Sequence, residues 1–246
     1  MRLLTFNTYF RRPARPRHRV LAERVERDGY DIVCLQEFMF RGNLGLIRDR
    51  LPHHAVRGAV LVEGGLVVLS RWPIAGSRLT RFPMAGGLRG EFLMRKGAQV
   101  ARIRTPEGDL AVVNTHLTYN RNDEWGPGSR FGPVLDGELR TLGRVIGEIP
   151  EHVPVVVMGD FNIARESPLL REFAARTGLR DLLAGDARPT VWPEEGYPAR
   201  PIDHVFTRGA ATGTADLVFT REVRLAGGRA ARLSDHYGIA TDLHLG

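Results

Sequence analysis

The most constraining feature of the sequence is an apolar run at residues 154–162, Pro-Val-Val-Val-Met-Gly-Asp-Phe-Asn. A β-branched run bounded by proline and glycine predicts a central strand buried on both faces. Because side chains alternate along an extended chain, Asp160 and Asn162 should face one site while Phe161 turns back into the core. Ligands bind at the carboxyl ends of strands in sheets covered by helices. The run therefore predicts either a reaction centre or an ordinary Asx turn.

The composition is that of a globular protein, with 43% hydrophobic and 26% charged residues in a chain of 246. No segment approaches the roughly 18 uninterrupted apolar residues that a membrane-spanning helix needs. The first predicted strand begins at Arg2, which leaves no room for a signal peptide, so we expect a cytoplasmic enzyme. Cys34 is the only cysteine, which excludes an internal disulfide, and its apolar neighbours predict a buried side chain.

The chain is strongly basic, with a formal charge of +7 and Lys96 as its lone lysine. Arginine suits bidentate contacts to phosphate, so the charge favours an anionic, phosphate-bearing partner. The alternative is an arginine-rich genome, in which case the charge has no functional content.

Apolar periodicity predicts a mixed α/β chain. An arginine-dense loop at 11–19 leads into a helix that begins near Val20 and ends near Gly29. Further helices are expected at 44–51, up to about Glu148, and from Ser167-Pro168 to Thr177, where Ser and Pro match the N-cap and N1 positions. Strands are expected at residues 2–6, 31–36, 55–61, 66–70, 78–81, 99–104, 110–115, 154–159, 202–207, 217–220 and 237–245.

We interpret residues 1–246 as a single domain, because no internal linker, low-complexity tract or repeat divides them. The expected fold is a four-layer α/β sandwich, two mixed β-sheets packed face to face with helices on the outside. A polar, glycine-rich loop at 118–132 with Trp125 at its centre interrupts the pattern, and loops of that length are usually functional or mobile.

Polar residues follow or open many of the predicted strands. Glu37, Asp160, Asp235 and Asn7 form an oxygen-rich set of the kind that Mg²⁺ or Mn²⁺ prefers. His236 is a candidate general base that Asp203 could orient. The histidines lack the spacing of a zinc helix, and no serine lies in a nucleophile elbow. Any one of these residues could be structural, so their joint occurrence carries the prediction.

The order of these motifs resembles the endonuclease/exonuclease/phosphatase superfamily of metal-dependent phosphoesterases. The matching motifs are Asn7, Leu35-Gln36-Glu37, Asn114-Thr115-His116-Leu117, Gly159-Asp160-Phe161-Asn162, Ile202-Asp203-His204 and Ser234-Asp235-His236. Residues 65–74 and Lys96-Gly97 are most similar to the neutral sphingomyelinase branch. His116 stands where abasic-site endonucleases usually have a tyrosine, which argues against that branch.

The resemblance implies a role for each matched residue. Glu37 would bind the divalent cation, with Asn7 beside it and Asp235 assisting the metal or the His236 region. Asp160 and His236 would activate and orient the attacking water, and the resemblance does not decide which of them takes the proton. Asp203 would hold His236 in its tautomer. Asn162 and His116 would donate hydrogen bonds to the phosphoryl oxygens, and the role of His204 stays open.

The leading hypothesis is a Mg²⁺- or Mn²⁺-dependent phosphodiesterase that acts on a phospholipid head group. Arg11 and Arg12 follow Asn7 and would meet substrate phosphate at the rim of the site. The loop around Trp125 could contact an apolar tail, which makes peripheral membrane contact possible. No obligate protein partner is inferred from the sequence. The alternatives are a nuclease, a phosphatase acting on a small metabolite or inositol phosphate, and a binding protein without catalysis.

Overall fold

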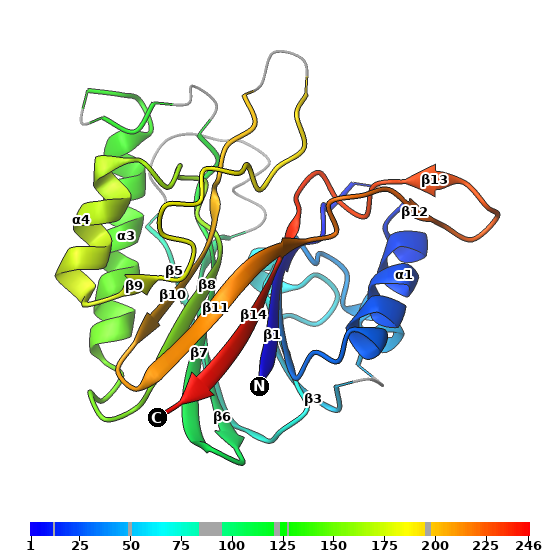
Figure 1. The fold of residues 1–246 in the computed structure, drawn as a ribbon, viewed down its shortest axis with the longest axis horizontal. Helices are drawn as coiled ribbons and strands as arrows, with labels where there is room; N and C mark the ends of the chain where they lie inside the picture. The colour runs from blue at the N-terminus through cyan, green and yellow to red at the C-terminus, as the bar shows by residue number, and fades with distance from the viewer. Residues whose placement is uncertain (12, 49–50, 84–94, 121–123, 127, 195–197) are drawn as a thin grey trace.

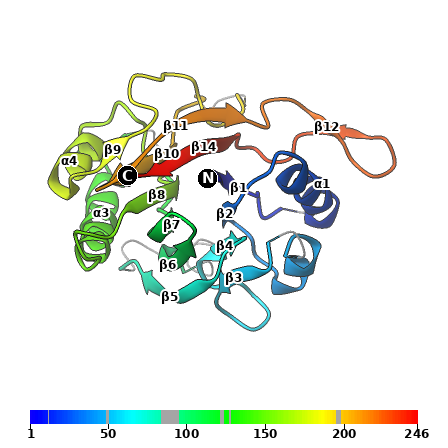
Figure 2. The same cartoon turned by 60° about the horizontal axis from the view of Figure 1, so that its bottom comes forward.

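Two six-stranded β-sheets lie face to face in the computed structural model of the chain (Figure 1). The structure describes residues 1–246 except 12, 49–50, 84–94, 121–123, 127 and 195–197. Helix α1 (Ala14–Arg27) covers one outer face, and helices α3 (Gly132–Gly147) and α4 (Pro168–Thr177) cover the other (Figure 2). This arrangement confirms the predicted four-layer sandwich.

The first sheet has the strand order β11-β14-β1-β2-β4-β3. Its neighbours β1 and β2 are parallel, and every other neighbouring pair in it is antiparallel. The strands are β1 (Arg2–Asn7), β2 (Ile32–Gln36), β3 (His53–Val56), β4 (Val67–Ser70), β11 (Ala211–Val218) and β14 (Gly238–Leu245).

The second sheet has the order β5-β6-β7-β8-β10-β9, with β7 and β8 parallel and the other pairs antiparallel. Its strands are β5 (Ile74–Arg81), β6 (Gly97–Thr105), β7 (Gly108–His116), β8 (Val155–Asp160), β9 (Arg180–Asp181) and β10 (Asp203–Arg208). A separate short hairpin, β12 (Val223–Arg224) and β13 (Ala230–Ala231), projects beside α1 (Figure 1).

Alternation along each strand divides the apolar side chains between three cores. In β8, Val156 and Met158 pack between the sheets, while Val155 and Val157 pack under α3 and α4. In β1, Leu3 points between the sheets and Leu4 packs under α1. Both faces of the central strands are therefore buried, as the apolar run predicts.

A carboxamide pair ties the two sheets together at their centre. Gln36 Nε2 donates to Asn114 Oδ1 at 2.7 Å, and Asn114 Nδ2 donates to the backbone oxygens of Leu35 and Val67 at 3.0 and 3.1 Å. Both side chains are fully buried. A buried amide without partners would be costly, so the pair fixes the two sheets in one relative position.

Several predicted elements have different bounds in the structure. Residues 11–19 were expected as a loop, but α1 begins at Ala14, and Arg17 is buried on the helix. The expected helix at 44–51 is a 3₁₀ turn, η1 (Arg41–Leu46). Strand β3 begins earlier and ends earlier than expected, and β11 covers Ala211–Val218 rather than 217–220. Alternating small and polar residues in β11 lack the apolar run on which the prediction relied.

Cys34 is buried, as expected, and burial raises the pKa of its thiol. In the described ranges, no helix is long and apolar enough to cross a membrane.

Candidate active site

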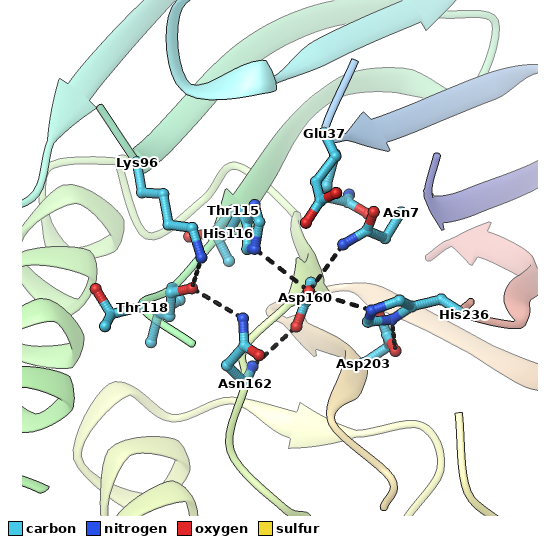
Figure 3. A network of polar contacts seen from close by, with 12 residues as sticks. Asn7, Glu37, Lys96, Thr115, His116, Thr118, Asp160, Asn162, Asp203 and His236 are labelled. Carbon is cyan, nitrogen blue, oxygen red and sulfur yellow. Dashed lines mark hydrogen bonds and ion pairs between the residues drawn. The ribbon is translucent and has the colours of Figure 1, made fainter. Parts of the chain in front are cut away.

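Six polar side chains converge at one end of the sandwich because of strand direction. The parallel pairs β1/β2 and β7/β8 deliver residues at their carboxyl ends. Strands β10 and β14 run antiparallel to their neighbours, so their first residues arrive at the same end. The converging residues are Asn7, Glu37, His116, Asp160, Asp203 and His236 (Figure 3).

Asp160 lies at the centre of this network. Its Oδ2 accepts a hydrogen bond from Asn7 Nδ2 at 3.0 Å and lies 3.4 Å from His116 Nε2 and 3.7 Å from His236 Nε2. Its Oδ1 accepts from the backbone N–H of Asn162 at 2.9 Å. The carboxyl group is 1% exposed, so all of these donors act on it away from bulk water (Figure 3).

His236 is held by a chain of hydrogen bonds behind it. Its Nδ1 donates to Asp203 Oδ2 at 2.9 Å, which leaves Nε2 directed toward Asp160. Thr190 Oγ1 donates to the same Asp203 oxygen at 2.6 Å and accepts from the backbone N–H groups of Ile202 and Asp203 at 3.0 Å. The bridge between Val191 and His236 places Thr190 behind the site. Thr190 was absent from the predicted site because no motif contains it.

The charges of these groups differ because their neighbours differ. Burial lowers the pKa of His236, but the charges of Asp203 and Asp160 outweigh it and raise that pKa well above its ordinary value. Burial raises the pKa of Asp160, and the positive charge of His236 opposes the rise. Burial keeps the pKa of His116 well below its ordinary value, aided by Lys96 and His236. The site thus combines a protonated His236 with a neutral His116.

Asn162 both closes an Asx turn and faces the site, so each interpretation of residues 154–162 holds in part. Its backbone N–H closes an Asx turn on Asp160, and its φ of 52° is left-handed, which asparagine tolerates. Its side chain nevertheless faces the site, where Nδ2 donates to Leu117 O at 2.9 Å (Figure 3). Phe161 is buried in the core beneath α3 and α4, as expected.

Glu37 sits on a constrained backbone at the end of β2. Its φ of 55° is rare for a residue with a side chain, and a Cβ on Gly65 would lie 3.1 Å from its Cα. Glu37 Oε2 accepts from the backbone N–H of Phe10 at 3.0 Å. The carboxylate is partly exposed and lies beside Asn7 (Figure 3). The fold thus holds an acidic side chain in an unusual position beside the reaction centre.

Two oxygen-rich groups could be considered for a metal ion. Ligand atoms of Asp160, Asp203 and His236 lie within 4.8 Å of one another. However, Asp203 Oδ2 already accepts from both Thr190 and His236, and a protonated imidazole has no lone pair for a metal. Glu37 and Asn7 supply the hard oxygen donors that suit Mg²⁺ or Mn²⁺, so these residues fit the cation better.

Lys96 is a site residue that the roles assigned from sequence missed. It is 8% exposed, and its Nζ donates to Leu117 O at 2.7 Å, the same oxygen that Asn162 contacts (Figure 3). The resemblance had already included Lys96-Gly97 without giving the lysine a role, and Lys96 is also the lone lysine among 35 basic residues.

Two other predicted residues, Asp235 and Arg11, lie outside this network. Asp235 accepts from Ser234 Oγ at 3.0 Å and lines a cavity beside the site, with no hydrogen bond to Glu37 or Asp160 among the described residues. Arg11 is exposed and lies over the Tyr9 ring at 5.7 Å, and Arg12 lies outside the described residues.

His204 is structural. Its Nε2 donates to Ile163 O at 2.7 Å, and burial lowers its pKa to about 3. The ring also packs edge-on against Phe161.

Comparison with known proteins identifies a family. The model of the Endonuclease/Exonuclease/phosphatase family matches residues 4–236. An inositol phosphosphingolipids phospholipase C of Schizosaccharomyces pombe is 30% identical over 216 residues, covering 79% of this chain and 47% of that protein. The chain therefore spans about half the length of this relative.

Solved structures share the fold at low sequence identity. Sphingomyelinase C from Streptomyces griseocarneus aligns with a TM-score of 0.73 and 20% identity, over 98% of both chains. Staphylococcus aureus beta toxin with bound magnesium ions aligns at 0.77 and 16%, over 98% of both chains. TDP2 from D. rerio, complexed with a single-strand DNA product, aligns at 0.75 and 18%, over 99% of this chain and 98% of the other.

Proposed function

Because the chain belongs to the endonuclease/exonuclease/phosphatase family, we propose that it is a divalent-metal-dependent phosphodiesterase. The observation that carries the proposal is the buried Asp160, placed between protonated His236 and the Glu37–Asn7 pair. In-line hydrolysis of a phosphodiester needs a positioned water, a proton acceptor and compensation of phosphate charge. Residues in this arrangement can supply all three.

Glu37 and Asn7 would hold the cation, with Glu37 as the carboxylate ligand. When bound, Mg²⁺ or Mn²⁺ would neutralise charge on the phosphate as it increases in the transition state. Magnesium is favoured because the similarly folded beta toxin binds it. Removal of the cation should leave the Asp160–His236–Asp203 network intact, because those residues are held by hydrogen bonds within the chain.

Asp160 is the group best placed to take the proton of the attacking water. His236 lies between two carboxylates that keep it protonated, so its Nε2 would donate a hydrogen bond to a phosphoryl oxygen. As the water oxygen bonds to phosphorus, its proton would pass to Asp160. The bond between phosphorus and the leaving oxygen would break, and that oxygen would keep the bonding electron pair and take a proton from water. Asp203 and Thr190 would hold the His236 ring in place throughout.

The other side of the site would stabilise the phosphate. Neutral His116 and the Asn162 amide line this side, and Asn162 has a second amide hydrogen beyond the one bound to Leu117 O. Lys96 adds a buried positive charge nearby. Lys96 and Asn162 would compensate negative charge without rearrangement, because Leu117 O holds both side chains in place.

A phospholipid head group is the favoured substrate. The fission-yeast relative is named as a phospholipase C, and the fold is shared with a sphingomyelinase. Near Glu37, Phe10 is 42% exposed and Phe40 39% exposed, and the bridge between Phe40 and Leu61 brings a third apolar side chain, itself 50% exposed, to the same edge. This edge would contact a lipid surface, which supports peripheral membrane binding.

A nuclease is the second candidate, favoured by the net charge of +7 and by the similar fold of a DNA-bound TDP2. Binding to DNA through arginine would weaken steeply with salt. Nicking of plasmid DNA faster than hydrolysis of any lipid would favour this candidate over the first.

The test is turnover of a substrate panel with Mg²⁺ or Mn²⁺ and with EDTA as control. The panel comprises phospholipids in mixed micelles, plasmid DNA, inositol phosphates and bis(p-nitrophenyl) phosphate. We expect metal-dependent hydrolysis of phosphodiesters that is lost in His236→Ala. Turnover that survives EDTA, or a His236→Ala protein as active as wild type, would contradict the proposal.

A further inference from the structure

The loop at 118–132 contributes one residue, Trp125, to the surroundings of the reaction centre. The indole Nε1 of Trp125 donates a hydrogen bond to the backbone oxygen of Asn162 at 3.1 Å. Its ring is partly buried and packs against the core beneath α3 and α4. Trp125 is not among the exposed large apolar side chains of the described residues, which are Phe10, Phe40, Val60 and Leu61. Its one polar atom is therefore directed at a site residue rather than at solvent.

Hydrogen bonds fix the described residues that lead up to Trp125. The backbone N–H and Oγ1 of Thr118 donate to the two carboxylate oxygens of Glu138 at 2.9 and 2.6 Å. Glu138 lies on α3 and is 3% exposed. Asn120 is also buried, and its Nδ2 donates to the backbone oxygen of Glu124 at 2.7 Å. These contacts attach the loop to α3 and present the indole in a defined orientation.

Asn162 depends on its hydrogen bonds because its backbone is left-handed, with φ of 52°. Its backbone N–H donates to Asp160 Oδ1 and its Nδ2 donates to Leu117 O, each at 2.9 Å (Figure 3). The carbonyl oxygen makes the third contact, and Trp125 supplies the donor. The direction of this carbonyl follows from the backbone angle ψ of Asn162. The indole bond therefore restricts the conformation from which the Asn162 side chain projects into the site.

We propose that Trp125 is a positioning residue, which holds Asn162 so that its second amide hydrogen is directed at the scissile phosphate. The inference rests on the proposed phosphodiesterase activity, in which Asn162 compensates charge on the phosphoryl oxygens. In this role Trp125 does not touch the substrate and acts through the Asn162 carbonyl. Contact with a lipid tail, the role that the sequence suggested, would affect membrane substrates alone. The two roles therefore give different results.

The first experiment compares wild type with Trp125→Phe on a soluble and a lipid substrate, because phenylalanine keeps an aromatic ring but lacks the N–H. We expect kcat to fall about tenfold on both bis(p-nitrophenyl) phosphate and phospholipid in mixed micelles, since one buried acceptor loses its donor. KM should stay within about twofold, because ground-state binding is little changed. A loss confined to the lipid substrate, or an unchanged kcat, would overturn the inference.

Trp72→Phe is the matched control for this comparison. Trp72 is also partly buried, but it packs against the core between the two sheets. Its replacement should leave kcat unchanged on both substrates. Circular dichroism verifies that both variants are folded.

A double-mutant cycle with Asn162→Gly separates positioning from a general loss of structure. Glycine removes the side chain and tolerates the left-handed backbone. Asn162→Gly should lower kcat by about 10²-fold, as loss of one transition-state donor does. If Trp125 acts through the Asn162 amide, Trp125→Phe should cause less than about a twofold further loss in the Asn162→Gly protein. Losses that multiply would show that the two residues act independently and would overturn the inference.

Exchange of the indole N–H tests the geometry without turnover. In protein with isotopically labelled tryptophan, the three indole NMR signals are assigned by their loss in Trp72→Phe, Trp125→Phe and Trp192→Phe. We expect the Trp125 signal to exchange with solvent at least about tenfold more slowly than in urea-unfolded protein. Micelles of an uncharged detergent should leave it unchanged. Fast exchange, or a shift of this signal with micelles, would place the indole at the surface and overturn the inference.

The same measurements separate this inference from the proposed function. Failure of wild type to hydrolyse any phosphodiester would overturn the proposed function. The exchange measurement would still decide whether Trp125 donates to Asn162 or faces lipid.

Discussion

At the scale of single residues, His236 depends on Asp203 for both its charge and its orientation. Replacing Asp203 by asparagine keeps the shape but removes the charge that outweighs burial of the ring. We expect Asp203→Asn to lower kcat by about 10²–10⁴-fold, as loss of a positioned acid–base group typically does. Steady-state kinetics measure this, with circular dichroism to verify folding. A fully active Asp203→Asn protein would show that His236 needs no carboxylate partner.

Thr190 contacts Asp203, which in turn holds His236, so we assign Thr190 a positioning role. Its hydroxyl donates to Asp203 and accepts two backbone N–H groups, all within a fully buried environment. Thr190→Val should reduce the free energy of unfolding by about 1–3 kcal/mol, because it leaves buried groups without partners. It should also lower kcat, and Thr190→Ser should restore both. Equal stability and kcat in the valine and serine variants would exclude this role.

The residues whose roles were predicted are positioned by the chain next to them, whereas the residues that were missed are positioned by contacts with distant segments. Asp160 was predictable because an apolar run ends at it, and the chain positions it through local geometry. Thr190 lies in a loop, 13 residues before Asp203, and meets it only after the chain has folded. Lys96 likewise acts through Leu117, 21 residues away. Contacts between distant segments leave no periodic trace in the sequence.

At the scale of elements, the end of β8 depends on a glycine. Gly159 has a φ of 146°, and a Cβ added there would lie 2.0 Å from Thr115 O in the parallel neighbour β7. We expect Gly159→Ala to destabilise the fold by about 3 kcal/mol or more, since strain and steric overlap act together in a buried strand. Urea denaturation measures this.

Gly137→Ala is the matched control, because Gly137 lies in α3 and nothing lies near its added Cβ. It should match or slightly exceed wild type in stability, since alanine favours helix. If Gly159→Ala unfolds at the same urea concentration as the control, the close approach of β7 and β8 does not make glycine necessary for stability at this position.

Elements with long apolar runs were predictable, and those with mixed composition were not. Strand β8 and the β6–β7 hairpin match their predictions because apolar alternation and a turn define them. The start of α1 was interpreted as a loop because five of its first six residues are Arg, Pro or His. Arg17 is helical and buried because backbone oxygens bind all of its N–H groups, a tertiary effect that composition does not show.

At the scale of the whole molecule, the dependence of stability on pH reflects groups whose pKa values change in opposite directions on folding. The raised pKa values of Asp160 and His236 mean that the folded state holds their protons more tightly than the unfolded state. His18 acts in the other direction, because burial, then Arg17 and Arg15, lower its pKa from 6.5 to about 4. Its ring is 3% exposed, stacks on Phe38 and has no hydrogen-bond partner for either nitrogen among the described residues.

The contribution of His18 can be isolated by comparing wild type with His18→Leu across pH. Between pH 6.5 and about 4, the unfolded chain binds a proton at His18 that the folded chain does not, so acidification costs wild type stability. The full loss would be about 3 kcal/mol, and it should be absent from His18→Leu. Asp160 and His236 titrate in both proteins, so their effects cancel in the difference. Urea denaturation at pH 7.5 and pH 4.5 measures it, and a constant stability difference between the two proteins would show that His18 is not held neutral.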